Sequence, residues 1–220
     1  MSHNARSASQ SSTATLTTPP RSGGDNTAGT LLHRWILWFI LATPAVAWTI
    51  GWFGNQTLQY AEHAVHPTGV IAGILVIVAL FATPWRQLVR NRYGALWLAR
   101  HRRHIGVASF GYALLHTWFY LLETESVPSI LTDLYRFDMV TGWIALLLFL
   151  PVAMTSNTPS VHTLGQRWKS VQRLTYAASI IGFIHILSLN GWSNPWEALI
   201  VASPLLVLEA WRVRRFLSTR

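Results

Sequence analysis

Cysteine is absent from this sequence of 220 residues, and charged residues are scarce. Without cysteine the chain cannot form disulfides, thiolate metal sites, iron–sulfur clusters or a covalent C-x-x-C-H haem attachment. Asp, Glu, Lys and Arg make up 11% of the residues, whereas an average soluble domain has about 25%. The sequence also lacks a GxGxxG fingerprint, so we do not expect this chain to oxidise a nicotinamide cofactor by itself.

Apolar residues are abundant instead, at 51% of the chain, and the net charge is +9. The basic residues stand between apolar stretches and form no interleaved basic and aromatic surface, so we expect no nucleic-acid partner. A membrane protein needs cationic cytoplasmic loops, and that demand accounts for the charge.

Six apolar stretches reach the length that a helix needs to cross the hydrocarbon core, which is roughly 17–25 residues. They are residues 35–53, 67–85, 104–122, 139–155, 172–190 and 195–211. The predicted fold class is therefore all-α, a polytopic membrane helix bundle with six transmembrane helices in a lipid bilayer.

The chain is predicted to have three parts. Residues 1–33 are rich in Ser, Thr, Asn and Gly and lack an apolar h-region, which predicts a disordered cytoplasmic tail rather than a signal peptide. Residues 34–212 form the membrane domain, and residues 213–220 form a basic cytoplasmic tail. With both termini cytoplasmic, 16 of the 17 Lys and Arg residues lie inside and only Arg136 lies outside, as the positive-inside rule requires.

His116 and His185 lie within two of these stretches, where an ionisable side chain is costly and indicates a functional site. His116 follows Arg103 by 13 residues, and His185 follows Arg173 by 12. At ~1.5 Å per residue, both imidazoles lie roughly 18–20 Å from the cytoplasmic boundary. Two axial ligands of one iron need such matched depths, so the pair predicts a b-type haem.

The helix faces beneath the two histidines carry small side chains. Residues at i−3 and i−7 share a face with residue i. On the faces of His116 and His185 these positions hold Ala113, Ser109, Gly182 and Ala178. A flat macrocycle needs such room, although close helix packing in membranes favours the same residues. A lone membrane histidine can also simply hydrogen-bond a neighbouring helix.

Further histidines stand at the predicted cytoplasmic boundary. His101, His104 and His162 could neighbour a flavin or a second haem there. His104 precedes His116 by 12 residues, which is about 120° around an ideal helix, so it does not repeat the His116 site.

A set of short motifs occurs in order between residues 66 and 190. They are His66-Pro67-Thr68-Gly69, Thr83-Pro84, Arg102-Arg103, Gly106, Leu115-His116, Thr155-Ser156, Leu164-Gly165, Trp168, Arg173-Leu174, Tyr176 and His185. Together they resemble the ferric reductase-like transmembrane family, and more narrowly its haem-binding membrane subunits of periplasmic methionine sulfoxide reductase systems.

The resemblance implies a multi-pass protein of the bacterial inner membrane that holds a b-type haem, with His116 and His185 as its outer iron ligands. It implies electron transfer to a periplasmic molybdenum-cofactor reductase that repairs oxidised methionine. The donor would be a cytoplasmic flavin reductase or a membrane quinol, and FMN would bind on the cytoplasmic side. The chain would then be an electron-transfer subunit rather than a complete enzyme.

One position departs from the family pattern, because Gln172 stands where the family has a further histidine. An amide is a poor iron ligand, so we expect one haem. The cytoplasmic residues Arg102, Arg103 and Arg173 could bind a flavin phosphate or a haem propionate, or could serve only as positive-inside anchors.

Two other interpretations remain open. The first is a ferric or quinol-linked reductase that uses the same haem. The second is a non-redox membrane transporter or assembly scaffold, in which the histidines bind protons or stabilise packing. Transporters often contain inverted repeats, and the sequence shows no convincing repeat.

Overall fold

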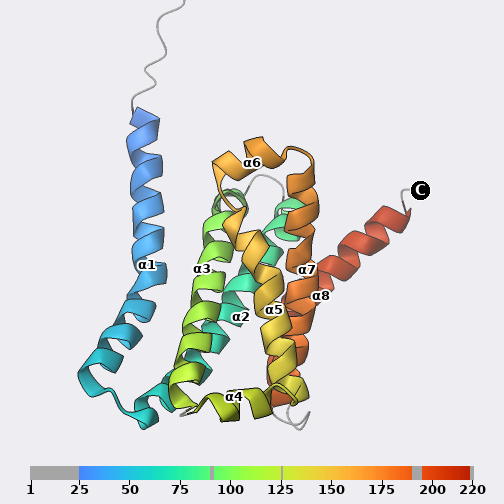
Figure 1. The fold of residues 1–220 in the computed structure, drawn as a ribbon. Helices are drawn as coiled ribbons and strands as arrows, with labels where there is room; N and C mark the ends of the chain where they lie inside the picture. The colour runs from blue at the N-terminus through green and yellow to red at the C-terminus, as the bar shows by residue number, and fades with distance from the viewer. Residues whose placement is uncertain (1–24, 90–91, 125, 190–194, 219–220) are drawn as a thin grey trace, which may run out of the picture. The chain divides into compact units, whose positions relative to one another are not determined.

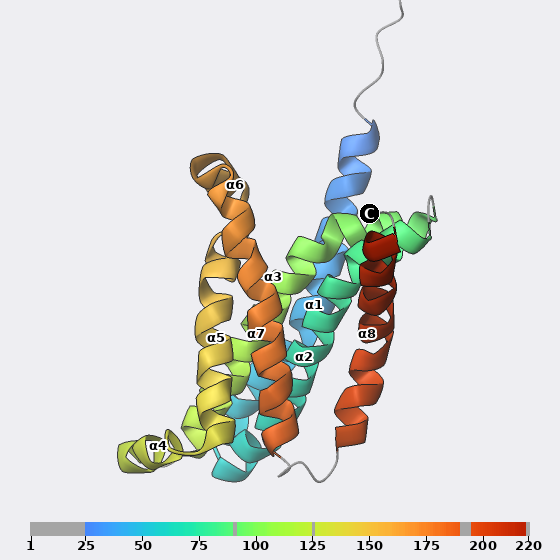
Figure 2. The same cartoon turned by 90° about the vertical axis from the view of Figure 1, so that its right-hand side faces the viewer.

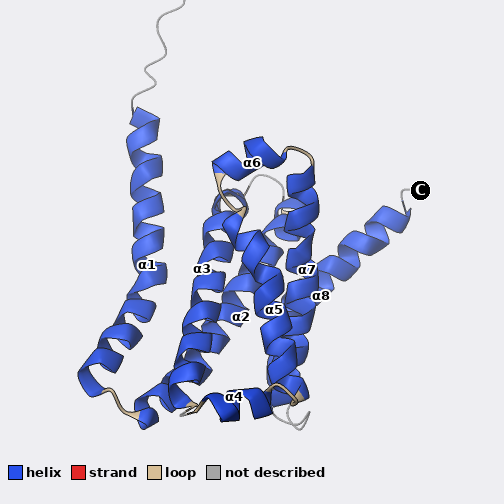
Figure 3. Cartoon of the chain, viewed as in Figure 1, coloured by secondary structure: helices blue, strands red, loops and turns tan. Residues whose placement is uncertain are grey.

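The structure, a computed structural model, describes residues 25–89, 92–124, 126–189 and 195–218, which form only helices and loops (Figure 3). The helices are α1 (Asp25–Asn55), α2 (Leu58–Leu88), α3 (Tyr93–Glu123), α4 (Val127–Asp133), α5 (Phe137–Met154), α6 (Thr158–Leu164), α7 (Arg167–Leu189) and α8 (Pro195–Ser218). The predicted all-α class is confirmed for these described ranges.

The chain divides into two units, residues 1–37 and residues 38–220. The described part of the first unit is the beginning of α1. Residues 1–24 of the predicted tail lie outside the described residues, whereas α1 begins at Asp25, inside the region 1–33 that we predicted as disordered. An acidic residue is favourable at a helix N-terminus because it meets the positive end of the helix dipole.

Four segments of the described residues are long and apolar enough to cross a membrane: Leu32–Asn55, Leu58–Leu88, Tyr93–Glu123 and Phe137–Met154. They match the first four predicted stretches, except that the fourth ends before residue 155. The predicted stretches 172–190 and 195–211 lie in α7 and α8, apart from residue 190, which is not described. Gln172, Arg173 and His185 lower the hydropathy of α7. Helix α8 continues to Ser218, through most of the predicted tail 213–220.

In the second unit, α2 packs against α3 and α5 packs against α7, each as an antiparallel pair (Figures 1 and 2). Helix α3 also contacts α5, and α8 contacts α2 and α7. The short helices α4 and α6 lie at opposite ends of these long helices in both views. Large apolar side chains such as Phe39, Leu147 and Ile200 are exposed on the outer faces, as contact with lipid requires.

Small residues let α2 and α3 approach closely at both ends of their contact. Near the α4 end, Ala61 and Ala64 of α2 are fully buried against Phe119 of α3. Near the other end, Ala82 of α2 is buried against Ile105 of α3. Alanine at a helix interface allows close backbone contact, which is the usual basis of helix association in membranes.

A tyrosine of α3 forms hydrogen bonds with the backbone of α1 beside the proline of that helix. Pro44 lies inside α1, and a proline interrupts the ladder of helical hydrogen bonds. The Tyr112 hydroxyl donates to the Leu41 carbonyl at 2.8 Å and accepts from the Ala45 amide at 3.2 Å. Tyr112 is 3% exposed, so no water competes for these groups. Insertion of a side chain into the ladder is one of the recognised causes of a helix bend.

Candidate functional site

A cavity of about 640 Å³ lies among α2, α3, α5, α7 and α8. Binding sites for small molecules and cofactors have volumes of roughly 300–1,000 Å³ and are lined mostly by apolar residues with a few polar groups. The lining here is mainly apolar, and the side chains of His116 and His185 are part of it. The cavity is therefore large enough for an organic ligand and presents two imidazoles to it.

The structure brings His116 of α3 and His185 of α7 together. Their ring centres are 6.4 Å apart, and the ring planes meet at 72°. The matched depths inferred from the sequence correspond to this close approach. His116 and His185 lie near the C-terminal ends of α3 and α7, and these helix ends lie on the side of the bundle where α4 is found (Figure 1).

Each imidazole is held by a backbone carbonyl of a neighbouring helix. Nδ1 of His116 donates to the Val65 carbonyl at 2.8 Å, and Nδ1 of His185 donates to the Asp138 carbonyl at 2.6 Å. Because a carbonyl can only accept, the proton of each neutral ring is on Nδ1, and Nε2 keeps its lone pair. This is the tautomer and the second-shell contact that metal-binding histidines usually have.

The separation of the rings fits a metal ion held between them. Metal–imidazole bonds of roughly 2.0–2.1 Å, with ring nitrogens about 1.1 Å from the ring centres, place two opposed imidazole centres about 6.3 Å apart. The observed 6.4 Å agrees with that arrangement. The residues present can therefore supply two axial ligands to one metal, as in a haem held by two histidines.

Two glycines leave room for the imidazole rings of the two histidines. A Cβ added to Gly69 of α2 would lie 2.9 Å from Nδ1 of His116, and a Cβ added to Gly142 of α5 would lie 2.9 Å from Cε1 of His185. A real Cβ atom essentially never makes contacts this short, so each ring occupies the space that a side chain at the glycine would fill. Glycine is used where another group must approach the backbone closely.

Three of the four small residues predicted beside the histidines line the cavity, and the fourth, Ala178, is not among its lining residues. Ser109, Ala113 and Gly182 line the cavity, and Ala178 is fully buried. The Ser109 hydroxyl donates to the Ala72 carbonyl at 2.8 Å, so its polarity is satisfied within the helix pair α2–α3.

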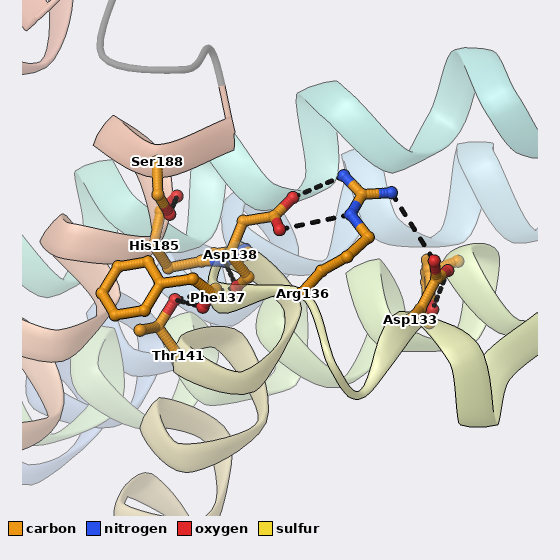
Figure 4. Close-up of polar contacts among 8 residues, drawn as sticks. Asp133, Arg136, Phe137, Asp138, Thr141, His185 and Ser188 are labelled. Atoms are coloured by element: carbon orange, nitrogen blue, oxygen red, sulfur yellow. Dashed lines mark hydrogen bonds and ion pairs between the residues drawn. The ribbon is translucent and has the colours of Figure 1, made fainter.

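A polar network supports the α5 side of the site (Figure 4). Two nitrogens of Arg136 contact the Asp138 carboxylate, at 2.6 and 3.3 Å, and a third lies 3.6 Å from Asp133. The Tyr120 hydroxyl donates to Asp133 at 2.9 Å. The hydrogen-bonded carboxylate of Asp138 raises the pKa of Arg136, so the guanidinium stays charged. This network ties α3 and α4 to the first turn of α5, whose Asp138 carbonyl holds His185.

The predicted site arginines lie away from the histidines. Arg102 and Arg103 precede His116 by 13–14 residues on α3, about 20 Å along the helix, and Arg173 precedes His185 by a similar distance on α7. Arg102 donates to the Thr83 hydroxyl at 2.7 Å, and the Arg103 guanidinium lies 5.6 Å from the centre of the Trp168 ring. The Arg173 side chain is exposed.

Gln172 has a packing role in this structure. Its side-chain nitrogen donates to the Val152 carbonyl at 3.2 Å and to the Thr155 hydroxyl at 3.1 Å, at the C-terminus of α5. The Trp168 indole nitrogen donates to the Thr155 carbonyl at 2.9 Å. Unpaired carbonyls at a helix end need such donors, and α7 supplies them to α5.

The remaining histidines differ in their surroundings. His66 lines the cavity. From the sequence, His66 stands at the end of an apolar stretch. Its position in the cavity wall depends on how α2 is rotated about its axis, which the sequence does not show. The His101 ring centre lies 4.5 Å from that of Trp97 and 6.0 Å from that of His104, and His162 is exposed on α6.

The family of ferric reductase-like transmembrane components matches residues 68–183, which include most of α2, all of α3 and α5, and most of α7. The chain belongs to this family, whose description agrees with a membrane helix bundle. Residues 68–183 also contain His116 and the two glycines, and they end just before His185.

Within this family the chain is similar to proteins named protein-methionine-sulfoxide reductase heme-binding subunit MsrQ. The protein of Brucella anthropi is 37% identical over 187 residues, which cover 82% of this chain and 81% of the relative. The protein of Brucella melitensis biotype 2 is 35% identical over 200 residues, which cover 85% of this chain and 86% of the relative. The likeness extends over most of both chains.

Proposed function

We propose that this chain is a b-type haem electron-transfer subunit of a membrane oxidoreductase system. It holds one haem, with His116 and His185 as the axial ligands. The observation that carries the proposal is the approach of the two rings to 6.4 Å in an apolar cavity, with both Nδ1 atoms bonded to carbonyls. The heme-binding subunits to which the chain is similar support the same cofactor.

Haem iron, when bound, carries one electron at a time by alternating between its ferric and ferrous states. The residues of this chain contribute binding and surroundings. The carbonyls of Val65 and Asp138 fix the direction of the two Nε2 lone pairs. Gly69 and Gly142 let the rings lie close to α2 and α5. The apolar walls keep water from the site, which limits the reorganisation that accompanies a change of charge.

The proposal includes the number of membrane-spanning helices and the side of the membrane on which the termini lie. We infer that α1, α2, α3, α5, α7 and α8 all span the bacterial inner membrane, with both termini and the tails 1–33 and 213–220 in the cytoplasm. The distribution of Lys and Arg supports this orientation. The histidine pair then lies in the periplasmic half of the bilayer, and Arg102, Arg103 and Arg173 lie near the cytoplasmic surface.

This orientation suggests a donor and an acceptor. We infer that electrons come from a cytoplasmic flavin reductase or a membrane quinol and pass to a periplasmic molybdenum-cofactor methionine sulfoxide reductase. The reductase named in the relatives' descriptions supports the acceptor. The three arginines at the cytoplasmic end could bind the phosphate of FMN, because guanidinium groups form charge-assisted hydrogen bonds with phosphates.

Spectroscopy of single variants tests the proposal. Purified, haem-replete protein is expected to show a Soret band that dithionite shifts, and His116→Ala and His185→Ala should each remove or strongly reduce it. His63→Ala is the matched control, since His63 is exposed and its Nδ1 also bonds a carbonyl, that of Gln59, at 2.6 Å. A full Soret band in both cavity variants, or a colourless wild-type protein, would overturn the assignment.

A further inference from the structure

Thr-Gly occurs twice in the sequence, at residues 68–69 and 141–142. The structure places one of these pairs beneath each cavity histidine. Gly69 lies under the ring of His116, and Gly142 lies under the ring of His185. In both helix pairs, α2–α3 and α5–α7, the glycine of a Thr-Gly sequence therefore leaves room for the ring of a histidine on the neighbouring helix.

Each threonine hydroxyl lies within hydrogen-bond distance of the carbonyls four and three residues before it; the shorter contact is to the carbonyl four residues before Thr68 and to the carbonyl three residues before Thr141. The Thr68 hydroxyl lies 2.7 Å from the Ala64 carbonyl and 2.9 Å from the Val65 carbonyl. The Thr141 hydroxyl lies 3.0 Å from the Phe137 carbonyl and 2.7 Å from the Asp138 carbonyl.

In each of the two helix pairs, α2–α3 and α5–α7, the carbonyl three residues before the threonine also accepts a hydrogen bond from the histidine Nδ1–H. Val65 serves His116 in this way, and Asp138 serves His185. Each threonine therefore shares an acceptor with one imidazole. Thr68 is fully buried and Thr141 is 7% exposed, so water does not replace either hydroxyl.

A shared acceptor changes the strength of both of its hydrogen bonds. A hydroxyl that donates to a carbonyl oxygen draws electron density from it, and the oxygen then accepts less strongly from the imidazole N–H. The hydrogen bond at Nδ1 sets how basic Nε2 is as a metal ligand. A less basic axial ligand stabilises the ferric state less, and hydrogen bonding around the ligands is one of the means by which proteins adjust haem potential.

We propose that Thr68 and Thr141 are paired positioning residues that limit the donor strength of His116 and His185 and so raise the reduction potential of the haem. This inference rests on the proposed function. It assigns to two buried side chains, neither of which coordinates the metal, a role that the fold alone does not require.

A threonine of α1 provides the control. The Thr49 hydroxyl donates to the Ala45 carbonyl, four residues earlier, at 2.8 Å. Thr49 is half-buried, and the residues that line the cavity come from α2, α3, α5, α7 and α8. Replacement of Thr49 therefore removes the same kind of hydrogen bond away from the two imidazoles.

The test is redox potentiometry of the purified, haem-loaded full chain, with electron paramagnetic resonance of its oxidised form. Thr68→Val and Thr141→Val keep the side-chain shape and remove the hydroxyl. Each is expected to shift the midpoint potential downward relative to wild type and to change the g values. The double variant should show the sum of the two shifts. Thr49→Val, Thr68→Ser and Thr141→Ser should stay at the wild-type potential.

An unchanged or raised potential in both valine variants would overturn the inference, as would an equal shift in Thr49→Val. Thr68→Ala and Thr141→Ala provide the same comparison if a valine variant is not recovered folded. A wild-type protein without haem bands would instead contradict the proposed function. The two failures are therefore distinguishable.

Discussion

The two halves of the site hold their histidines alike but support them differently. In the α2–α3 half, His116 lies beside an apolar core in which Ala61, Ala64 and Phe119 are fully buried. In the α5–α7 half, His185 lies beside the polar network of Arg136, Asp138 and Asp133 (Figure 4). The direct contacts of the two rings are therefore alike, although the packing around them differs.

The largest expected effect comes from the glycines, which both halves need equally. Gly69→Ala and Gly142→Ala each place a methyl group 2.9 Å from an imidazole atom, so the ring must move. Removal of second-shell support costs metal sites about 10–100-fold in affinity. We expect at least about a tenfold loss of haem affinity in either variant, measured by haem titration of the apoprotein.

Gly111→Ala is the control for this prediction. Gly111 is also in a long helix, α3, and a Cβ there meets nothing within 4 Å. Haem affinity should be unchanged in this variant, and alanine should favour the helix by up to about 1 kcal/mol. Equal affinities in Gly69→Ala, Gly142→Ala and Gly111→Ala would show that the rings do not rest on the glycines.

The next prediction affects only the α2–α3 half. Tyr112→Phe removes the hydroxyl that bonds Leu41 and Ala45 beside Pro44 and leaves buried backbone groups unpaired. Such a loss costs about 1–3 kcal/mol. A lower melting temperature in detergent is expected, with an unchanged haem spectrum. Tyr93→Phe, at a residue that is 74% exposed, should melt like the wild type, and an equal drop in both variants would contradict the role of Tyr112.

A complementary prediction affects only the α5–α7 half. Arg136→Gln leaves the Asp138 carboxylate, which is 11% exposed, without its cation. Because the guanidinium itself is 56% exposed, we expect a modest loss of about 1 kcal/mol. Thermal melts at low and high salt measure this, and the difference from wild type should narrow as salt rises. Arg100→Gln, at an exposed position, is the control. Identical melting curves for all three proteins would refute the stabilising role.

A comparably small effect is expected at the end of α5 that is far from the histidines. Gln172→Ala removes two hydrogen bonds to Val152 and Thr155 and should cost about 0.5–1.5 kcal/mol in stability. If Gln172 is a packing residue, the ratio of haem to protein stays the same as in wild type. A pyridine haemochrome assay measures that ratio, and Gln166→Ala, in an exposed position, serves as control. A lower ratio in Gln172→Ala alone would show that Gln172 takes part in haem binding.

Much of this arrangement could be predicted from the sequence. The lengths of the apolar stretches predicted the long helices, and the distances from Arg103 to His116 and from Arg173 to His185 predicted their matched heights. The small residues Ser109, Ala113 and Gly182 were expected beside a ligand, and they line the cavity.

The other features could not be predicted because they depend on how the helices are rotated. Apolar residues surround a membrane helix on every side, so its pattern does not show which face meets which neighbour. The acceptors of the imidazoles are backbone carbonyls, those of Val65 and Asp138, which every residue has. The short helices α4 and α6 were also missed, since residues 127–133 and 158–164 are too short for a span. The repeated Thr-Gly is a further signal in the sequence, because each copy places its glycine against one of the two histidine rings.

The most direct measurement is low-temperature electron paramagnetic resonance of the oxidised, purified protein, together with its haem content. If His116 and His185 bind one iron from opposite sides, the spectrum contains a single low-spin ferric species, at one haem per chain. Replacing either histidine by alanine then abolishes that species. A high-spin signal in the wild type, or a low-spin signal that persists in both alanine variants, would contradict the central claim.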